Sequence, residues 1–101
     1  KVIGFISYGN FRDEAIQAGE IIALYVLKDY YGKGVSEQLM HAAFAALDHF
    51  SEIYLWVLKE NKRAIAFYQK MGFSFDGQEK ILELGTPVKE LRMMYSSNKN
   101  S

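Results

Sequence analysis

The residues best suited to chemistry lie in one short turn, Tyr30-Tyr31-Gly32-Lys33-Gly34-Val35-Ser36. The turn joins the apolar run 21–27 to a helical pattern that begins near Gly34. Glycines leave backbone N–H groups unshielded, and a helix that starts beside them adds the positive end of its dipole. Such a turn suits an anion, above all a phosphate group. Because Gly-x-Gly also occurs in turns that bind nothing, the turn alone leaves both interpretations open.

The segments around this turn predict a layered α/β domain. The runs 21–27 and 53–58 are apolar at successive positions, as in strands that are covered on both faces. Apolar residues from Val35 to Phe50 recur at spacings of three and four, which indicates a helix packed on the sheet. Asn61 can cap a second helix that Gly72 ends. In chain order we expect strands at 2–8, 20–27, 53–58, from 73 onward and at 88–95, with a loop at 11–19 and helices at 34–49 and 61–72.

The strands that bracket the long helix should be parallel neighbours, because a strand–helix–strand crossover in one sheet is right-handed and short. The segment 88–95 alternates charge and bulk, so we expect an antiparallel edge or hairpin strand there. The polar segment 97–101 should be a disordered tail. One domain, residues 1–96, is all that 101 residues allow.

Composition excludes several classes of function. Twelve basic and twelve acidic side chains cancel, so no net field would recruit nucleic acid or an anionic membrane. The sequence holds no cysteine, which removes thiol nucleophiles and fits a reducing, cytoplasmic location. No apolar run approaches the roughly 20 residues of a membrane span. His41 and His49 lie on the predicted helix without a third ligand, so we expect no metal site.

Three segments resemble the GNAT superfamily of acetyl-CoA-dependent N-acetyltransferases, in the order and at the spacing of that family. They are the strand and turn 23–34, the motif Asn61-x-x-Ala64-x-x-Phe67-Tyr68-x-x-x-Gly72-Phe73, and the closing run 90–95. The second motif is the most specific. The run Tyr25-Val26-Leu27-Lys28 with the glycine turn is most similar to bacterial polyamine acetyltransferases of the PaiA type.

The resemblance implies a mixed β-sheet with a central, parallel, splayed strand pair and packed helices. The chain would lack the first strand and helices of that fold, since it opens on Lys1 inside a strand-like run, and it would be a trimmed domain or a fragment. The loop of the family usually reads Gln or Arg, two residues, Gly, one residue, then Gly or Ala. Here those three positions hold Tyr31, Gly34 and Ser36, and we expect cofactor binding to survive this departure.

The resemblance also implies acetyl-CoA as cosubstrate. The pantetheine arm would pair with the backbone of the first splayed strand, and the amides of the turn, helped by Lys33, would hold the pyrophosphate. The residues implied to bind the cofactor are Leu24, Tyr25, Val26, Tyr31, Gly32, Lys33, Gly34, Val35, Ser36 and Asn61.

Two side chains are implied to be catalytic. Tyr68 matches the tyrosine that faces the cofactor sulfur and acts as general acid, whereas helical spacing alone would make it a core aromatic residue. Glu20, at the mouth of the splayed strand, could be the general base directly or through water, or else a solvated strand-end carboxylate.

The resulting hypothesis is direct transfer of an acetyl group from acetyl-CoA to a primary amine, on a small molecule or a peptide, in a ternary complex. Two alternatives remain. One is a cofactor-binding or regulatory module without acceptor chemistry. The other is a fragment that forms a homodimer to cover its exposed sheet edge.

Overall fold

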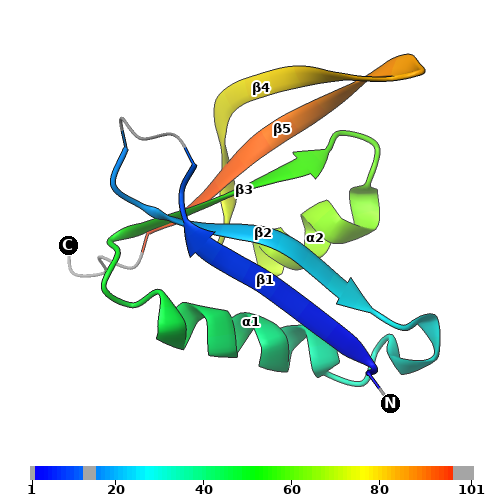
Figure 1. The fold of residues 1–101 in the computed structure, drawn as a ribbon. Coiled ribbons are helices and arrows are strands. Elements are labelled where there is room, and N and C mark those ends of the chain that lie inside the picture. The colour runs from blue at the N-terminus through cyan, green and yellow to red at the C-terminus, as the bar shows by residue number, and fades with distance from the viewer. Residues whose placement is uncertain (1, 13–15, 97–101) are drawn as a thin grey trace.

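The computed structural model describes residues 2–12 and 16–96 of the chain. It contains strands β1 (Gly4–Asn10), β2 (Gly19–Val26), β3 (Glu52–Leu58), β4 (Ser74–Leu84) and β5 (Thr86–Ser96). A short 3-10 turn, Lys28–Tyr30, follows β2, and the two helices are α1 (Val35–Ala46) and α2 (Lys62–Lys70). The predicted order of strands and helices is confirmed (Figure 1). The predicted tail at 97–101 lies outside the described residues.

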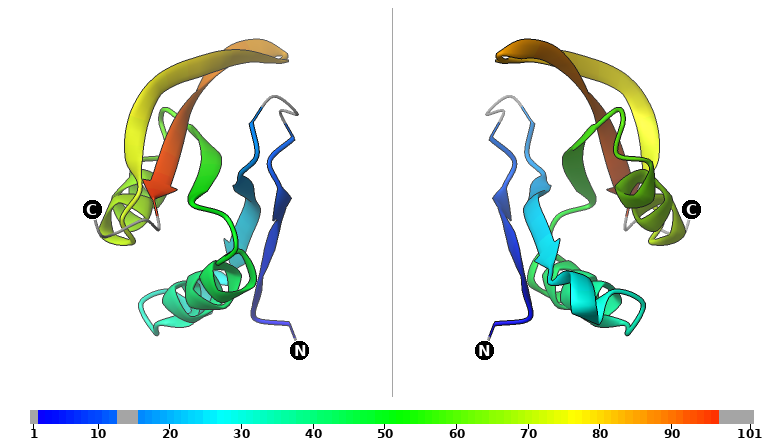
Figure 2. Two further views of the ribbon diagram at one scale, coloured as in Figure 1. Left: turned by 90° about the vertical axis from the view of Figure 1, so that its left-hand side faces the viewer. Right: turned by 90° about the vertical axis from the view of Figure 1, so that its right-hand side faces the viewer.

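The five strands form one mixed sheet in the order β1-β2-β3-β5-β4. β2 and β3, which bracket α1, are parallel, and every other neighbouring pair is antiparallel. The parallel pairing predicted from the helix between them is therefore confirmed. β5 is part of a hairpin as expected, but it is not an edge strand, because it lies between β3 and β4. The hairpin tip projects beyond the end of β3 (Figures 1 and 2).

Both helices pack on one face of the sheet. Met40 and Ala43 of α1, and Leu47 at its C-cap, are buried in a single apolar cluster with residues from β2, β3 and β5. The apolar side of α2 packs against the same cluster through Ala64, Ile65, Phe67, Tyr68 and Met71. Because side chains alternate along a strand, the face opposite this cluster carries the intervening residues.

The opposite face has a second, smaller cluster of its own. Phe11, Ala18 and Tyr54 are buried there, and the rings of Phe11 and Tyr54 stack with centroids 4.7 Å apart. Ile22 and Tyr25 of β2 are exposed. Among the described residues, neither helix is long and apolar enough to cross a membrane.

Candidate active site

The parallel strands β2 and β3 separate after a short paired stretch. They are in register only at Gly19↔Ile53, Glu20↔Tyr54 and Ile21↔Leu55, although β2 continues to Val26. Leu27 donates its N–H to the carbonyl of Ile3, next to β1, at 2.8 Å. Because backbone polar groups of alternate residues point to opposite edges of a strand, those of Leu24 and Val26 are directed into the gap beside β3.

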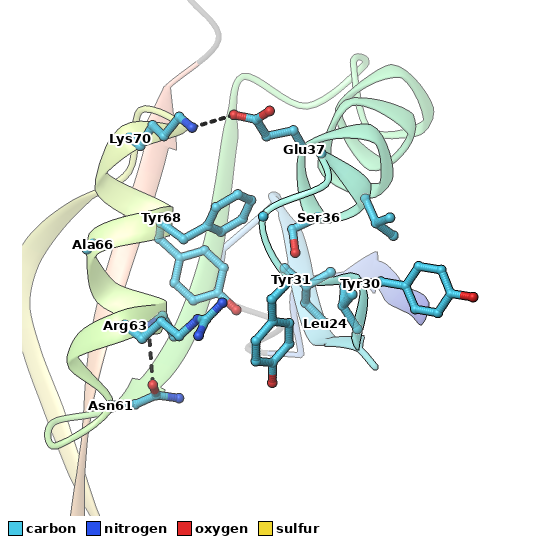
Figure 3. A pocket seen from close by; sticks show the side chains of 16 residues that line it. Leu24, Tyr30, Tyr31, Ser36, Glu37, Asn61, Arg63, Ala66, Tyr68 and Lys70 are labelled. Atoms are coloured by element: carbon cyan, nitrogen blue, oxygen red, sulfur yellow. Dashed lines mark hydrogen bonds and ion pairs between the residues drawn. The ribbon is translucent and has the colours of Figure 1, made fainter. Parts of the chain in front are cut away.

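A cleft of about 530 Å³ opens at this gap on the helical face. Its walls are the end of β2, the turn that follows, the first turn of α1 and one side of α2 (Figure 3). The lining residues are Leu24, Val26, Tyr30, Tyr31, Gly32, Gly34, Val35, Ser36, Glu37, Asn61, Arg63, Ala64, Ala66, Phe67, Tyr68 and Lys70. We refer to it as the first cleft.

The glycine turn holds a backbone conformation that other residues adopt only with strain. Gly32 and Gly34 have φ angles of 76° and 80°. A side-chain carbon added at either position would meet no atom within 4 Å, so glycine is required by the backbone angle and not by lack of space. Gly34 is the N-cap of α1 and gives it no side-chain cap. The first N–H groups of the helix are thus left for an external acceptor.

Tyr68 brings a phenol to the first cleft. Its ring packs edge-on against Phe67 and Phe73, with centroids 5.8 and 6.0 Å away. Its hydroxyl points into the cleft from α2 (Figure 3). Burial raises the pKa of Tyr68, because the charged phenolate is poorly solvated there. The hydroxyl is therefore a proton donor at neutral pH.

Asn61 starts α2 and places its first turn. Its side-chain Oδ1 accepts a hydrogen bond from the backbone N–H of Ala64 at 3.2 Å, as predicted for an N-cap.

An ion pair joins the two helices beside the first cleft. Lys70 Nζ of α2 lies 2.6 Å from Glu37 Oε2 of α1. The hydrogen bond from Lys70, followed by its charge, lowers the pKa of Glu37. The ion pair between Lys70 and Glu37 connects the two helical walls of the cleft.

A second cleft of about 390 Å³ lies on the opposite face of the sheet, lined by Phe11, Arg12, Glu20, Trp56, Lys80 and Arg92. Glu20 is only 1% exposed. Arg12 donates to both carboxylate oxygens of Glu20, from Nε to Oε1 at 3.0 Å and from Nη2 to Oε2 at 2.7 Å. Its backbone N–H adds a third bond, to Oε1 at 3.3 Å. Glu20 raises the pKa of Arg12, first by the hydrogen bond and then by its charge.

The arrangement of a split parallel pair, a glycine turn and a tyrosine-bearing helix agrees with comparison to known proteins. The sequence model of the acetyltransferase (GNAT) family matches residues 1–73. The chain belongs to the GNAT family. The resemblance seen in the motifs and the expected fold class are thereby confirmed.

Two curated GNAT relatives come from Bacillus subtilis. The probable spermine N(1)-acetyltransferase of subspecies natto is 33% identical over 97 residues, which cover 89% of this chain and 64% of the relative. The spermine/spermidine N(1)-acetyltransferase of strain 168 is 32% identical over the same shares. The chain thus spans just under two thirds of the length of these relatives.

Solved structures support the same fold. The protein PH1933 of Pyrococcus horikoshii OT3 superposes with a TM-score of 0.79 at 28% identity, over 97% of this chain and 60% of that one. Naa20 of Chaetomium thermophilum, solved with a bisubstrate analogue, gives a TM-score of 0.81 at 20% identity, over 95% and 60% of the two chains. This second likeness concerns the fold alone.

The structure brings most of the predicted site residues together. Those that line the first cleft are Leu24, Val26, Tyr31, Gly32, Gly34, Val35, Ser36, Asn61 and Tyr68. Tyr25 and Lys33 do not line it. The ring of Tyr25 lies on the exposed face of the sheet, with its centroid 5.8 Å from that of Phe5. Glu20 is neither in the first cleft nor solvated, because it is buried at the second cleft against Arg12.

Sequence reasoning missed Arg63 and the Glu37–Lys70 pair, which also line the first cleft. Arg63 could have been found from its place in the first turn of α2, two residues after the cap Asn61. The ion pair of Glu37 with Lys70 joins two helices that are far apart in sequence, so no local sequence pattern predicts this pair.

Proposed function

We propose that this GNAT chain is the catalytic part of an N-acetyltransferase that moves an acetyl group from acetyl-CoA to a primary amine by direct attack. The observation that carries the proposal is the first cleft, where an open sheet gap, an uncapped helix N-terminus and a phenol converge. Acetyl-CoA supplies a thioester that an amine can attack.

The residues of the first cleft fit the parts of that cofactor. The backbone groups of Leu24 and Val26, turned into the gap, would pair with a peptide-like pantetheine arm. The turn at Gly32 and Gly34 would bring backbone N–H groups and the start of α1 to the pyrophosphate. With the cofactor so placed, Tyr68 would hold its proton at Oη beside the sulfur and release it as the thiol leaves.

We propose that the acceptor amine approaches from the second cleft, which lies on the opposite face of the sheet beside Glu20, next to the point where β2 and β3 stop pairing. An alkyl amine is about one part in a thousand neutral at physiological pH, so its proton must be removed. Glu20 is the candidate base, acting through water. Among the described residues, its Oε2 accepts one hydrogen bond, from Arg12, which leaves a second lone pair on this oxygen for a water molecule.

The acceptors to test first are spermidine, after which the Bacillus subtilis relative is named, and lysine-containing peptides, because a peptidyl-lysine N-acetyltransferase of Salmonella typhimurium is 30% identical over 73 residues. Release of free CoA thiol would be followed with acetyl-CoA and each amine, beside calorimetric titration with acetyl-CoA. Tyr68→Phe should lower turnover by about 10²–10⁴-fold with little change in the Kd of acetyl-CoA. If the wild-type chain gives neither heat of binding with acetyl-CoA nor release of CoA thiol with any amine, the proposed N-acetyltransferase function is refuted.

A cofactor-binding module is the second candidate, because the first cleft holds most of the predicted cofactor residues while the candidate base Glu20 is buried in an ion pair with Arg12. Such a module would bind acetyl-CoA with normal affinity and show no turnover with any amine. The wild-type titration and the thiol assay, read together, separate it from an enzyme.

A homodimer and a cytoplasmic location are further proposals. β1 is an edge strand, and its residue Phe5 is exposed beside Tyr25, so a second chain could cover this edge. Sedimentation at several concentrations tests this, and a monomer at all of them would count against it. The absence of cysteine from the sequence suits the reducing cytoplasm.

A further inference from the structure

Arg63 spans the first cleft from one wall to the other. It lies in the first turn of α2, and its side chain extends toward the glycine turn (Figure 3). The central guanidinium carbon is 3.8 Å from the centroid of the Tyr31 ring. This distance is well within the range of a cation–π contact. The contact therefore joins α2 to the turn at the place where an anion would enter.

The charges of the cleft make Arg63 distinctive. Two cations line it, Arg63 and Lys70. Lys70 is paired with Glu37 at 2.6 Å, whereas Arg63 makes no ion pair within the described residues. Lys33, which the motif implied as the phosphate-binding cation, does not line the cleft. Since the whole chain has no net charge, attraction of an anion depends on local cations, of which Arg63 is the unpaired one that lines the cleft among the described residues.

The contact with Tyr31 leaves Arg63 able to bind. The central carbon of the guanidinium lies over the ring, and the five N–H donors project from the edges of the guanidinium plane. Those edges match a pair of phosphate oxygens in a bidentate contact. The ring of Tyr31 thus orients Arg63 without occupying its donors.

We propose that Arg63, oriented by Tyr31, binds the pyrophosphate of coenzyme A opposite the N-terminus of α1. Arg63 would bind the phosphate oxygens that the long polar side chain at the position of Tyr31 would bind in related loops. In this chain the cation comes from α2, and Tyr31 of the loop orients it. The inference rests on the proposed function, because it assumes that the first cleft holds this cofactor.

The test is calorimetric titration of the wild-type chain and its variants with CoA and with 3′-dephospho-CoA. Arg63→Gln should weaken both ligands by about 10- to 100-fold, as expected for loss of a charge-assisted contact. Arg63→Lys, which keeps the charge but not the fork, should fall between. The matched control is Lys62→Gln, which removes a neighbouring exposed cation that does not line the cleft and should stay within about twofold.

Tyr31 variants test the support. Tyr31→Ala removes the ring and should weaken both affinities about two- to fivefold, whereas Tyr31→Phe, which keeps the ring, should weaken them less than Tyr31→Ala does. In the Arg63→Gln background, Tyr31→Ala should have no further effect, because the two residues act together. Tyr31→Gln in that background should restore part of the affinity, since it returns a polar side chain to the loop.

Three results would overturn the inference. One is an Arg63→Gln variant that binds as well as Lys62→Gln. Another is a loss for CoA with 3′-dephospho-CoA unchanged, which would assign Arg63 to the 3′-phosphate. The third is a Tyr31→Ala effect that is equal in both backgrounds. If the folded wild-type chain bound neither ligand, the proposed function itself would be wrong. If the wild-type chain bound them and Arg63→Gln bound equally well, only the role of Arg63 would be wrong.

Discussion

Removing the cap of α2 should separate the structural role of Asn61 from its proposed role in binding. The cap is one hydrogen bond, from the backbone N–H of Ala64 to Asn61 Oδ1 at 3.2 Å, and it is exposed. Substitution of an N-cap asparagine by alanine costs about 0.5–2 kcal/mol. Because this bond is exposed and not short, we expect Asn61→Ala to lose about 1 kcal/mol of unfolding free energy.

A loss of that size lowers the melting temperature of a domain of this length by about 4–8 °C. Urea unfolding and thermal melting, both followed by circular dichroism, measure the two quantities. Asn61→Ser is the matched control, since serine caps a helix about as well as asparagine but has no amide donors. It should melt close to the wild type.

The same pair of variants tests binding. If the Asn61 amide contacts the cofactor, Asn61→Ser will bind acetyl-CoA more weakly although its stability is unchanged. If Asn61 acts only by positioning α2, Asn61→Ser will bind normally and Asn61→Ala will show the defect. The reasoning about the cap is refuted if Asn61→Ala unfolds within about 0.3 kcal/mol of the wild type, well below the range for a lost cap.

Three further predictions concern stability. Because burial raises the pKa of Tyr68, the folded chain keeps this proton to higher pH than the unfolded chain does. The contribution of Tyr68 to the free energy of unfolding is therefore full below pH ~10 and falls above it. In urea titrations at several pH values, Tyr68→Phe should reduce that fall by up to about 1.4 kcal/mol per pH unit. Gly72→Ala should cost about 2 kcal/mol, since φ is 104° and the new carbon would lie 3.1 Å from the Tyr95 ring, whereas Gly85→Ala, with open space, should cost about 1 kcal/mol. Equal losses would contradict the steric part of this argument. Met93→Ala, at a residue with 0% exposure, should cost about 2–5 kcal/mol, and a loss below 1 kcal/mol would mean that the core closes over the cavity.

The order of strands and helices could be predicted because local signals agree with one another. Asn61 marks the start of α2 as its N-cap, and Gly72 marks its end. The successive apolar positions of β2 and β3 predict central strands. The place of β5 could not be predicted, because its alternation describes a strand with one polar face and does not say which strands flank it.

The candidate site was predictable where backbone conformation sets it. Gly32 and Gly34 both line the first cleft and both have positive φ angles. Because a turn with positive φ angles requires glycine, the two glycines identify this turn in the sequence. The environments of Glu20 and Arg63 depend instead on partners across the fold, Arg12 and Tyr31. Sequence spacing carries no information on such pairs, so neither the burial of Glu20 against Arg12 nor the position of Arg63 over Tyr31 could be predicted.

The split between β2 and β3 explains the first cleft. A central strand pair would normally complete its ladder, because unpaired backbone groups that are shielded from water cost free energy. Here pairing ends at Ile21↔Leu55, and the groups of Leu24 and Val26 face the gap. An extended ligand can complete that ladder from the helical face, while the second cleft lies on the other face beside Glu20, within the stretch that is still paired. Under the proposed function the two reactants would therefore approach from opposite faces of the sheet, as direct transfer in a ternary complex requires.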